Sequence, residues 1–156
     1  MQTFILPKSG GYKMSKEYNL QKSICEYLRL QYPNVLFTSS MDGVKLPIGL
    51  AVKQKILRSC RGWPDIFICH PSNGYSGLFL EVKADSCEIF KKSGDFKTDH
   101  VKEQNMLMTK LNDLGFKAYF VWTFEGSKML IDQYFKVLTP AELAENRIND
   151  EMSRLF

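Results

Sequence analysis

Two short stretches of the chain carry residue types that can do chemistry together. The first is Gly62-Trp63-Pro64-Asp65, and the second, Glu81-Val82-Lys83, follows after a short apolar run and a turn. Magnesium prefers hard oxygen ligands and usually takes only one or two carboxylates from a protein, which leaves positions for water and a substrate phosphate. Asp65 and Glu81 are candidates for these two ligands. The pattern is typical of a metal-dependent phosphodiesterase.

Lys83 is the third member of this candidate site. A strand directs side chains i and i+2 to the same face, so we expect the ammonium of Lys83 beside the Glu81 carboxylate. There it would place a positive charge where a water is deprotonated and where negative charge develops on phosphate. A Glu-x-Lys pair alone is ordinary on the polar face of a strand, and Pro64-Asp65 alone is common turn chemistry. The prediction therefore rests on their combination.

Two strands joined by a tight turn must position these residues. The apolar run at 65–69 and the alternating run at 77–84 flank Asn73-Gly74, which is a strong hairpin signal. Alternation in the second run puts three aliphatic side chains on one face, Leu78, Leu80 and Val82. The other face receives one aromatic and two charged side chains, Phe79, Glu81 and Lys83. Pairing through the turn brings both carboxylates to the same end of the sheet.

Helical patterns surround the hairpin. One helix is predicted from an N-cap at Ser15 to about Gln31, and another begins at Thr98 or Asp99 and ends at Gly115. Gln104 lies on the apolar stripe of the second helix, where a buried amide needs hydrogen-bond partners from the backbone or from a water.

The remaining patterns complete the expected architecture. They predict a strand at 35–39, a short helix at 48–57, a buried strand at 117–123, a helix at 127–135 and a capping box at 139–142. This alternation favours an α/β fold with a mixed central β-sheet flanked by helices.

Positive charge is concentrated just ahead of the Pro-Asp motif. The net charge of +4 and the pI near 8.8 only slightly favour an anionic partner. Residues 45–61, however, include five basic and no acidic side chains: Lys45, Lys53, Lys55, Arg58 and Arg61. A basic segment beside a metal site indicates contacts with a phosphate backbone, and the alternative is a solvated loop and helix face. Lys91, Lys92 and Lys97 add cations farther along, diluted by Glu88 and Asp95.

Composition argues against several other classes. With 156 residues, 44% hydrophobic and 13% aromatic, the chain suits one domain with a single core. The four cysteines lack the clustered spacing of a zinc site, and we expect them to be reduced. No apolar run approaches the ~20 residues that span a membrane, and no signal-like N-terminus is present. We therefore expect a soluble, cytoplasmic protein without a membrane partner.

Together these residues resemble the VRR-NUC domain of the PD-(D/E)xK nuclease superfamily. The resemblance extends from about Glu17 to Phe135 and rests on separated elements: Glu17 with Gln21, Gly62-x-Pro64-Asp65, Glu81-x-Lys83, and Gln104 in a helix that leads through Gly115 into a strand. Trp63 departs from the small aliphatic residue common at its position, and the segment before Glu17 has no counterpart.

The resemblance implies a restriction-endonuclease-like core and a magnesium- or manganese-dependent DNA nuclease. Asp65 and Glu81, with the carbonyl of Val82, would bind the metal, and Lys83 would be the catalytic lysine. Gln104 would position Lys83 or a water.

The resemblance also implies a further site residue and the partners of the chain. Glu17 would act at the site through a water or a second ion. Free-standing phage and bacterial members of the family imply a homodimer that cuts branched DNA such as a four-way (Holliday) junction. The expected organisation is a flexible N-terminal arm at 1–14, a nuclease domain at 15–138 and a C-terminal helix at 139–156.

Other interpretations stay open. A DNA-binding or assembly subunit on a nuclease-like scaffold would not cut, although the intact Asp65, Glu81 and Lys83 argue against it. A nuclease for RNA or for free DNA ends is also compatible, because contacts with the backbone do not disclose the polymer. Glu17 in a first helical turn also complements the helix dipole. The sequence gives no direct evidence of the oligomeric state.

Overall fold

The computed structural model describes residues 15–40 and 47–139, together with positions 142, 144, 145, 148, 149 and 152. Three parts of the sequence predictions lie outside these residues: the N-terminal arm at 1–14, Lys45 and most of the C-terminal helix at 139–156. Among the helices of the described segments, none has the length and apolar character needed to cross a membrane.

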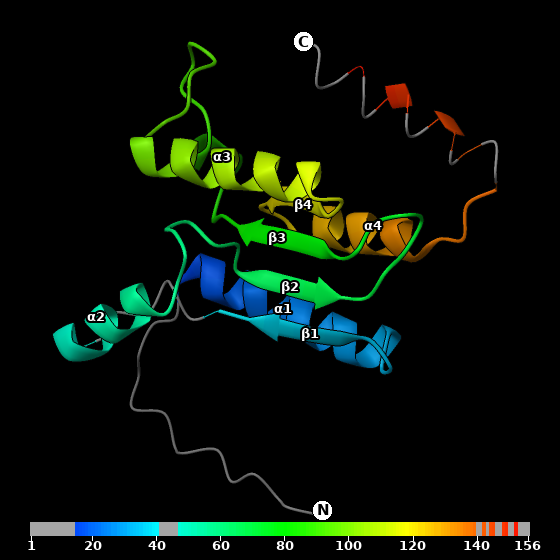
Figure 1. The fold of residues 1–156 in the computed structure, drawn as a ribbon, viewed down its shortest axis with the longest axis horizontal. Helices are drawn as coiled ribbons and strands as arrows, with labels where there is room; N and C mark the ends of the chain where they lie inside the picture. Colours follow the sequence, from blue (N-terminus) through cyan, green and yellow to red (C-terminus); the bar gives the residue numbers. More distant parts are fainter. Residues whose placement is uncertain are drawn as a thin grey trace, which may run out of the picture.

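A mixed sheet of four strands, in the order β1-β2-β3-β4, forms the centre of the fold (Figure 1). β1 (Leu36–Ser39) pairs antiparallel with β2 (Ile66–Cys69), and β2 pairs antiparallel with β3 (Leu78–Val82). β3 pairs parallel with β4 (Lys117–Val121). The predicted turn at Asn73-Gly74 joins β2 to β3, and both residues have the positive φ that this kind of hairpin requires.

Helices cover both faces of this sheet (Figure 1). α1 (Lys16–Gln31) and α4 (Phe124–Phe135) pack on one face, and α3 (Asp99–Asp113) packs on the other. The short α2 (Ile48–Ile56) extends away from the body, and a 3-10 turn, η1 (Ser86–Glu88), follows β3. The predicted α/β class, with a mixed sheet between helices, is confirmed.

The alternation in β3 divides the apolar core into two parts. Leu78, Leu80 and Val82 join the cluster formed with α1 and α4. Phe79 points to the opposite face, where it stacks on Phe67 with the ring centroids 4.3 Å apart and packs against α3. Each fully buried aliphatic or aromatic side chain contributes about 1.5–3 kcal/mol. Glu81 and Lys83 follow Phe79 on the same face, as predicted, and the structure shows that this is the face covered by α3.

Side chains cap the elements at predicted positions. Ser15 and Thr98 each accept a hydrogen bond at 3.2 Å from the backbone N–H three residues ahead, at the starts of α1 and α3. The predicted capping box is also present: Thr139 N donates to Glu142 Oε2 at 2.9 Å, and Glu142 N donates to Thr139 Oγ1 at 3.3 Å.

The predicted start of the last helix at Ser127 is wrong. α4 begins at Phe124, because Thr123 accepts a hydrogen bond from the N–H of Gly126 and acts as the N-cap. Ser127 is instead fully buried inside the helix, and its hydroxyl donates to the carbonyl of Thr123 at 2.7 Å.

Candidate active site

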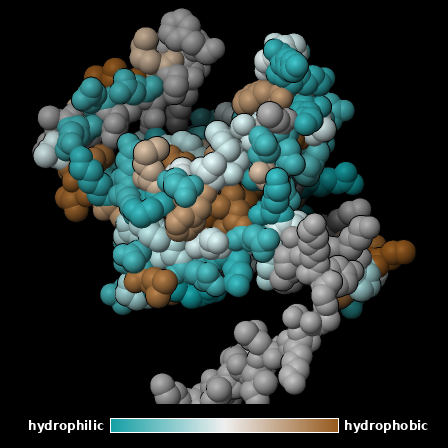
Figure 2. Space-filling view, turned by 180° about the vertical axis from the view of Figure 1, so that it is seen from behind, coloured by the Kyte–Doolittle hydropathy of each residue, from teal (hydrophilic) through white to brown (hydrophobic). Residues whose placement is uncertain are grey.

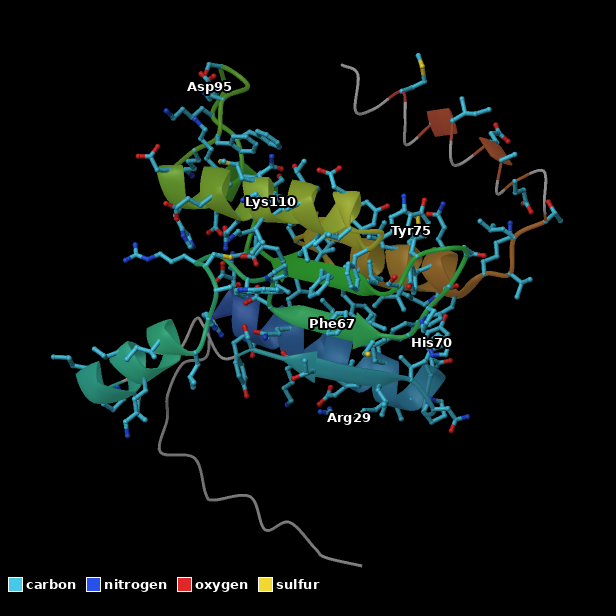
Figure 3. All side chains as sticks on the ribbon, viewed as in Figure 1. Arg29, Phe67, His70, Tyr75, Asp95 and Lys110 are labelled. Carbon is cyan, nitrogen blue, oxygen red and sulfur yellow. The ribbon has the colours of Figure 1, made fainter. Side chains whose placement is uncertain are left out.

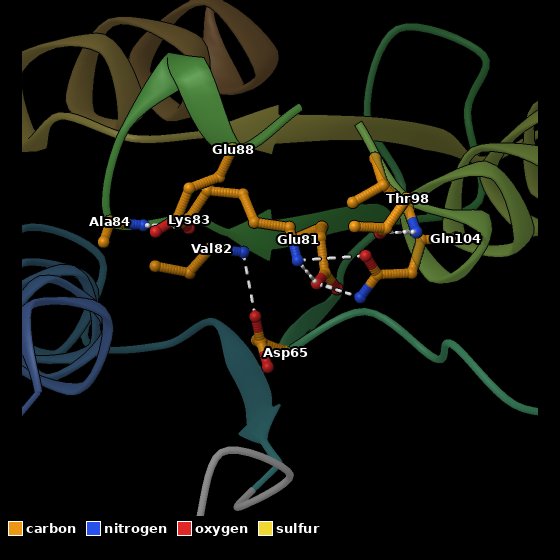
Figure 4. Close-up of polar contacts among 9 residues, drawn as sticks. Asp65, Glu81, Val82, Lys83, Ala84, Glu88, Thr98 and Gln104 are labelled. Carbon is orange, nitrogen blue, oxygen red and sulfur yellow. Dashed lines mark hydrogen bonds and ion pairs between the residues drawn. The ribbon is translucent and has the colours of Figure 1, made fainter. Parts of the chain in front are cut away.

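Asp65 and Glu81 lie opposite each other where the ladder between β2 and β3 ends. Ile66 pairs with Leu80, so the same register extended by one residue sets Asp65 against Glu81. Asp65 Oδ2 accepts a hydrogen bond of 2.8 Å from the N–H of Val82 (Figure 4). The side chain of Asp65 thus ties the start of β2 to the end of β3. The hairpin brings the two predicted metal ligands together.

Glu81, Lys83 and Gln104 form a closed hydrogen-bonded group (Figure 4). Lys83 Nζ donates to Glu81 Oε1 and to Gln104 Oε1, both at 2.9 Å, and Gln104 Nε2 donates to the same oxygen of Glu81. All three residues are buried, with exposed fractions of 3%, 8% and 5%. The amide on the apolar stripe of α3 therefore finds its partners in two charged side chains of the strand, rather than in the backbone. We call Glu81, Lys83 and Gln104 the buried polar group.

The two oxygens of Glu81 have different surroundings. Oε1 accepts the two hydrogen bonds just described, whereas Oε2 is buried and has no hydrogen-bond partner among the described residues. Burial raises the pKa of Glu81 to about 8; the negative charge of Asp65 adds to this rise and the positive charge of Lys83 opposes it. An unpartnered carboxylate oxygen in the interior is unfavourable, and a bound cation would relieve it.

These residues fit a divalent ion with hard oxygen ligands. Within residues 15–40, 47–139 and the described positions beyond, no group of three or more His, Cys, Asp or Glu side chains is arranged to hold a metal. Magnesium does not need one, since it commonly keeps several waters and uses one or two protein carboxylates. Asp65 and the free oxygen of Glu81 supply that number, and the role predicted for the Val82 carbonyl stays a prediction.

Two further carboxylates lie beside the buried polar group. Burial raises the pKa of Glu17, in the first turn of α1; the charge of Lys83 opposes the rise and the charge of Glu88 adds to it. Glu88, in η1, accepts a hydrogen bond of 3.3 Å from the N–H of Ala84. The sequence interpretation placed Glu17 at the site but counted Glu88 only as a charge diluting nearby lysines. No pattern in the sequence indicates the 3-10 turn that brings Glu88 back toward β3.

Gln21, which the resemblance grouped with Glu17, supports the site from a distance. Its Nε2 donates to Ser39 Oγ at 2.6 Å and to the carbonyl of Ser40 at 2.7 Å. The N–H of Ser40 donates in turn to the carbonyl of Asp65 at 2.6 Å. Gln21 therefore holds α1 against the end of β1 that adjoins Asp65.

Gly62 brings the start of the Pro-Asp motif against α3. Its φ is +80°, and a Cβ at this position would lie 3.2 Å from Cγ of Gln104. The next residue, Trp63, contacts the ring of Phe79 with the centroids 6.1 Å apart. The segment just before Asp65 thus packs directly on Gln104, which hydrogen-bonds Lys83. The sequence did not predict this contact.

The predicted nucleic-acid-binding segment is basic and also apolar. Lys45 and the side chain of Lys55 lie outside the described residues, Lys53 and Arg61 are exposed, and Arg58 is partly buried. α2 and the residue after it also expose aliphatic side chains, with exposed fractions from 50% to 86%: Ile48, Leu50, Val52, Ile56 and Leu57. Figure 2 shows these brown apolar atoms projecting at the right of the molecule. The structure thus adds an apolar surface to the predicted cations.

Comparison with known proteins identifies the fold. A solved structure described as "VRR_NUC domain protein" matches with a TM-score of 0.55 and 21% sequence identity, covering 81% of this chain and 93% of that chain. Another, described as "VRR_NUC domain", matches with a TM-score of 0.44 and 21% identity, covering 78% and 100%. No family model and no curated protein matches the sequence. The chain has an α/β restriction-endonuclease-like fold, and this fold is that of a VRR-NUC domain.

Proposed function

We propose that this protein is a divalent-metal-dependent nuclease that hydrolyses phosphodiester bonds in DNA. One observation carries the proposal: within the described part of the chain the buried Glu81 Oε2 has no hydrogen-bond partner, and it belongs to a carboxylate that lies opposite Asp65 and binds Lys83. A small cation and a phosphate are the ligands that such a combination suits. The VRR-NUC fold supports the same interpretation.

Asp65, Glu81 and the carbonyl of Val82 are the proposed ligands for Mg²⁺ or Mn²⁺. When bound, the ion would polarise the scissile phosphate and lower the pKa of a bound water. The two carboxylates would both be ionised in that state, because the cation offsets the repulsion and the burial that now raise the pKa of Glu81.

Lys83 is the proposed catalytic lysine. Its ammonium is held by two hydrogen bonds, so it needs little reorganisation to orient an attacking water and to stabilise negative charge on the phosphate. Gln104 is a positioning residue, because it contacts both Lys83 and Glu81 and keeps their spacing fixed. Glu17 is proposed to act on a water at the edge of the site, which the effect of the Lys83 charge on the pKa of Glu17 supports.

Branched DNA cut by a homodimer is the finer form of the proposal. The exposed Lys53 and Arg61 support contacts with a phosphate backbone. The exposed aliphatic side chains of α2 support a contact between two copies, because exposed apolar patches commonly mark protein interfaces. Two copies would place two active sites on a symmetric junction, one for each nick.

A cleavage assay tests the reaction and the substrate together. Labelled four-way junction, flap, linear duplex, single-stranded DNA and RNA are each incubated with magnesium, manganese or EDTA. We expect cleavage of branched DNA with either metal and none in EDTA. Full activity in EDTA would contradict the metal, and preferential cleavage of RNA or of free ends would replace the proposed substrate.

Four variants test the residues. Asp65→Ala and Glu81→Ala should abolish cleavage without loss of the fold, since removing one carboxylate relieves repulsion in the metal-free site. Lys83→Ala should keep metal and DNA affinity but lose most of the single-turnover rate, because its charge matters chiefly when charge develops on the phosphate. Lys83→Arg should rescue only in part, since a planar guanidinium does not replace a compact ammonium.

Single-turnover cleavage and DNA binding are measured in parallel, with Lys110→Ala, an exposed lysine on α3, as the control. Equal cleavage by the wild type and Lys83→Ala would remove the catalytic assignment. A wild type that binds DNA but cuts no nucleic acid would belong with the non-cleaving DNA-binding subunits.

A further inference from the structure

Residues 89–97, between η1 and α3, form a short hairpin that we call the arm. Its base is fixed: Ile89 is buried, and the N–H of Lys97 donates to the carbonyl of Ile89 at 2.9 Å. Phe90 and Phe96 then face each other across an antiparallel bridge. Figures 1 and 3 show the arm rising beyond the N-terminal end of α3. The arm therefore projects from the body while its base is part of the core.

The tip of the arm is a closed turn. The N–H of Lys91 donates to the carbonyl of Asp95 at 2.8 Å, and the N–H of Gly94 donates to the carbonyl of Lys91 at 3.0 Å. Gly94 has a φ of +89°, a conformation that glycine adopts without strain. These bonds give the backbone of the tip a defined shape.

An aromatic ring is left exposed on this arm. Phe90 stacks on Phe96 with the ring centroids 5.4 Å apart and the planes inclined by 26°, yet 52% of Phe90 is exposed. Pairing across a hairpin needs only one face of each ring. A second flat ring could extend this stack on the open side of Phe90, and nucleobases have such a face whatever their sequence.

Charge on the arm favours the same kind of partner. The arm has three exposed lysines, Lys91, Lys92 and Lys97, and a single acidic residue, Asp95, whose carboxylate already accepts a hydrogen bond from Ser93 at 2.8 Å. An exposed aromatic ring among ammonium groups is the combination by which proteins bind single-stranded nucleic acid, since the ring stacks on a base and the cations contact phosphates.

The arm also joins the two elements that carry the buried polar group. The chain leaves β3 at Val82, continues through Lys83, forms η1 and the arm, and enters α3, which carries Gln104. A nucleotide held by the arm would therefore be bound by the same segment of chain that connects Lys83 to Gln104.

We propose that the arm binds an unpaired nucleotide, with its base stacked on Phe90 and its flanking phosphates on the arm lysines. The proposal deepens the proposed nuclease function and rests on it for the cleavage event: the substrate would be DNA that offers an unstacked base beside the scissile phosphate. Binding itself needs neither metal nor cleavage.

Two substitutions of Phe90 test the stacking. Phe90→Leu keeps an apolar contact with Phe96 but removes the flat ring, and Phe90→Tyr keeps the ring. Affinity is measured in EDTA for a single-stranded oligonucleotide and for a blunt duplex of the same length. Phe90→Leu should weaken single-strand binding by about five- to 150-fold, the usual effect of losing one base–aromatic stack. Duplex binding, and all binding by Phe90→Tyr, should stay within about twofold of wild type.

Met129→Leu is the matched control, because Met129 is an exposed apolar side chain on α4, 66% exposed and away from the arm. An oligonucleotide containing 2-aminopurine provides a second readout, on the wild-type protein itself. Its fluorescence should be quenched when the base stacks on Phe90, and Phe90→Leu should reduce this quenching. Unchanged fluorescence with saturating wild-type protein would overturn the proposal, whatever the stability of the variants.

The remaining outcomes separate this proposal from the proposed function. Equal loss of single-strand and duplex binding in Phe90→Leu would show a general contribution to affinity and would overturn base stacking. If the wild type cuts DNA but Phe90→Leu binds single strands as tightly as the wild type does, the proposed role of the arm is overturned and the proposed nuclease function is not. If single-strand binding depends on Phe90 but the protein cuts no nucleic acid, base stacking on the arm is supported and the proposed nuclease function is overturned.

Discussion

Glu81 carries its carboxyl in surroundings that disfavour its charge. Burial beside Asp65 raises its pKa to about 8, although Lys83 is close enough to offset part of the effect. In the unfolded chain the same group titrates near its ordinary value of 4.5. Between these two values Glu81 therefore binds more protons in the folded metal-free protein than in the unfolded chain, and we expect its contribution to stability to fall as the pH rises through that interval.

Replacing Glu81 by glutamine should remove this pH dependence. In EDTA, Glu81→Gln should melt at a higher temperature than wild type at pH 8.5 and at nearly the same temperature at pH 4. The shift corresponds to about 5 kcal/mol, or roughly 10–20 °C for a chain of this length. The measurement is thermal unfolding followed by circular dichroism across this pH range, with the exposed Glu125→Gln on α4 as control. If the difference in melting temperature between Glu81→Gln and wild type is the same at every pH, Glu81 is not the group that causes the pH dependence.

At the level of elements, the segment before β2 and the helix α3 depend on each other at Gly62. A side chain at this position would need a positive φ and would press on Gln104 at 3.2 Å. Gln104 in turn fixes Lys83 and Glu81. The glycine of the Pro-Asp motif therefore affects the site without contacting either carboxylate.

Gly62→Ala should lower stability and activity together. We expect a loss of about 1–3 kcal/mol from the strained backbone, and a larger fall in kcat than in DNA affinity because Gln104 is displaced. Gly49→Ala is the control, since Gly49 lies in α2 with nothing within 4 Å of a new Cβ, and alanine favours a helix by up to about 1 kcal/mol. Thermal unfolding and single-turnover cleavage measure both effects. A fully active Gly62→Ala would show that Gln104 tolerates the displacement.

Local patterns predicted the elements well. The Asn73-Gly74 turn and the alternation in β3 were sufficient to predict that Asp65 and Glu81 lie at the same end of the sheet. The observed register then sets them opposite each other. The start of α4 was missed, because Ser127 competes with Thr123 as a cap and only the structure shows which side chain accepts the bond.

Contacts between distant segments were beyond such patterns. The sequence indicates that Gln104 needs partners, but the choice of Lys83 and Glu81 depends on how α3 packs on the sheet. The approach of Glu88 depends likewise on a short 3-10 turn, and neither has a periodic signal.

At the level of the whole molecule, α2 and the arm both extend on the side where β3 ends (Figure 1).

Neutralising Lys53 and Arg61 together should weaken DNA binding at low salt. It should also flatten the slope of log affinity against log salt by up to about 0.9 for each lost contact with duplex. Binding is measured over a salt series, with Lys22→Ala and Lys110→Ala combined as a control of equal charge. An unchanged slope would mean that these cations face only solvent.

The order of strands in the sheet matches their order in the chain, so each strand pairs with the one before it. Pairings of this kind close short stretches of chain, and a low average sequence separation between contacts favours fast folding. The longest of these closures joins β3 to β4 and contains α3. Docking α3 in that closure also brings Gln104 to Glu81, so all three residues of the buried polar group lie on β3 or between β3 and β4, and none lies on α4.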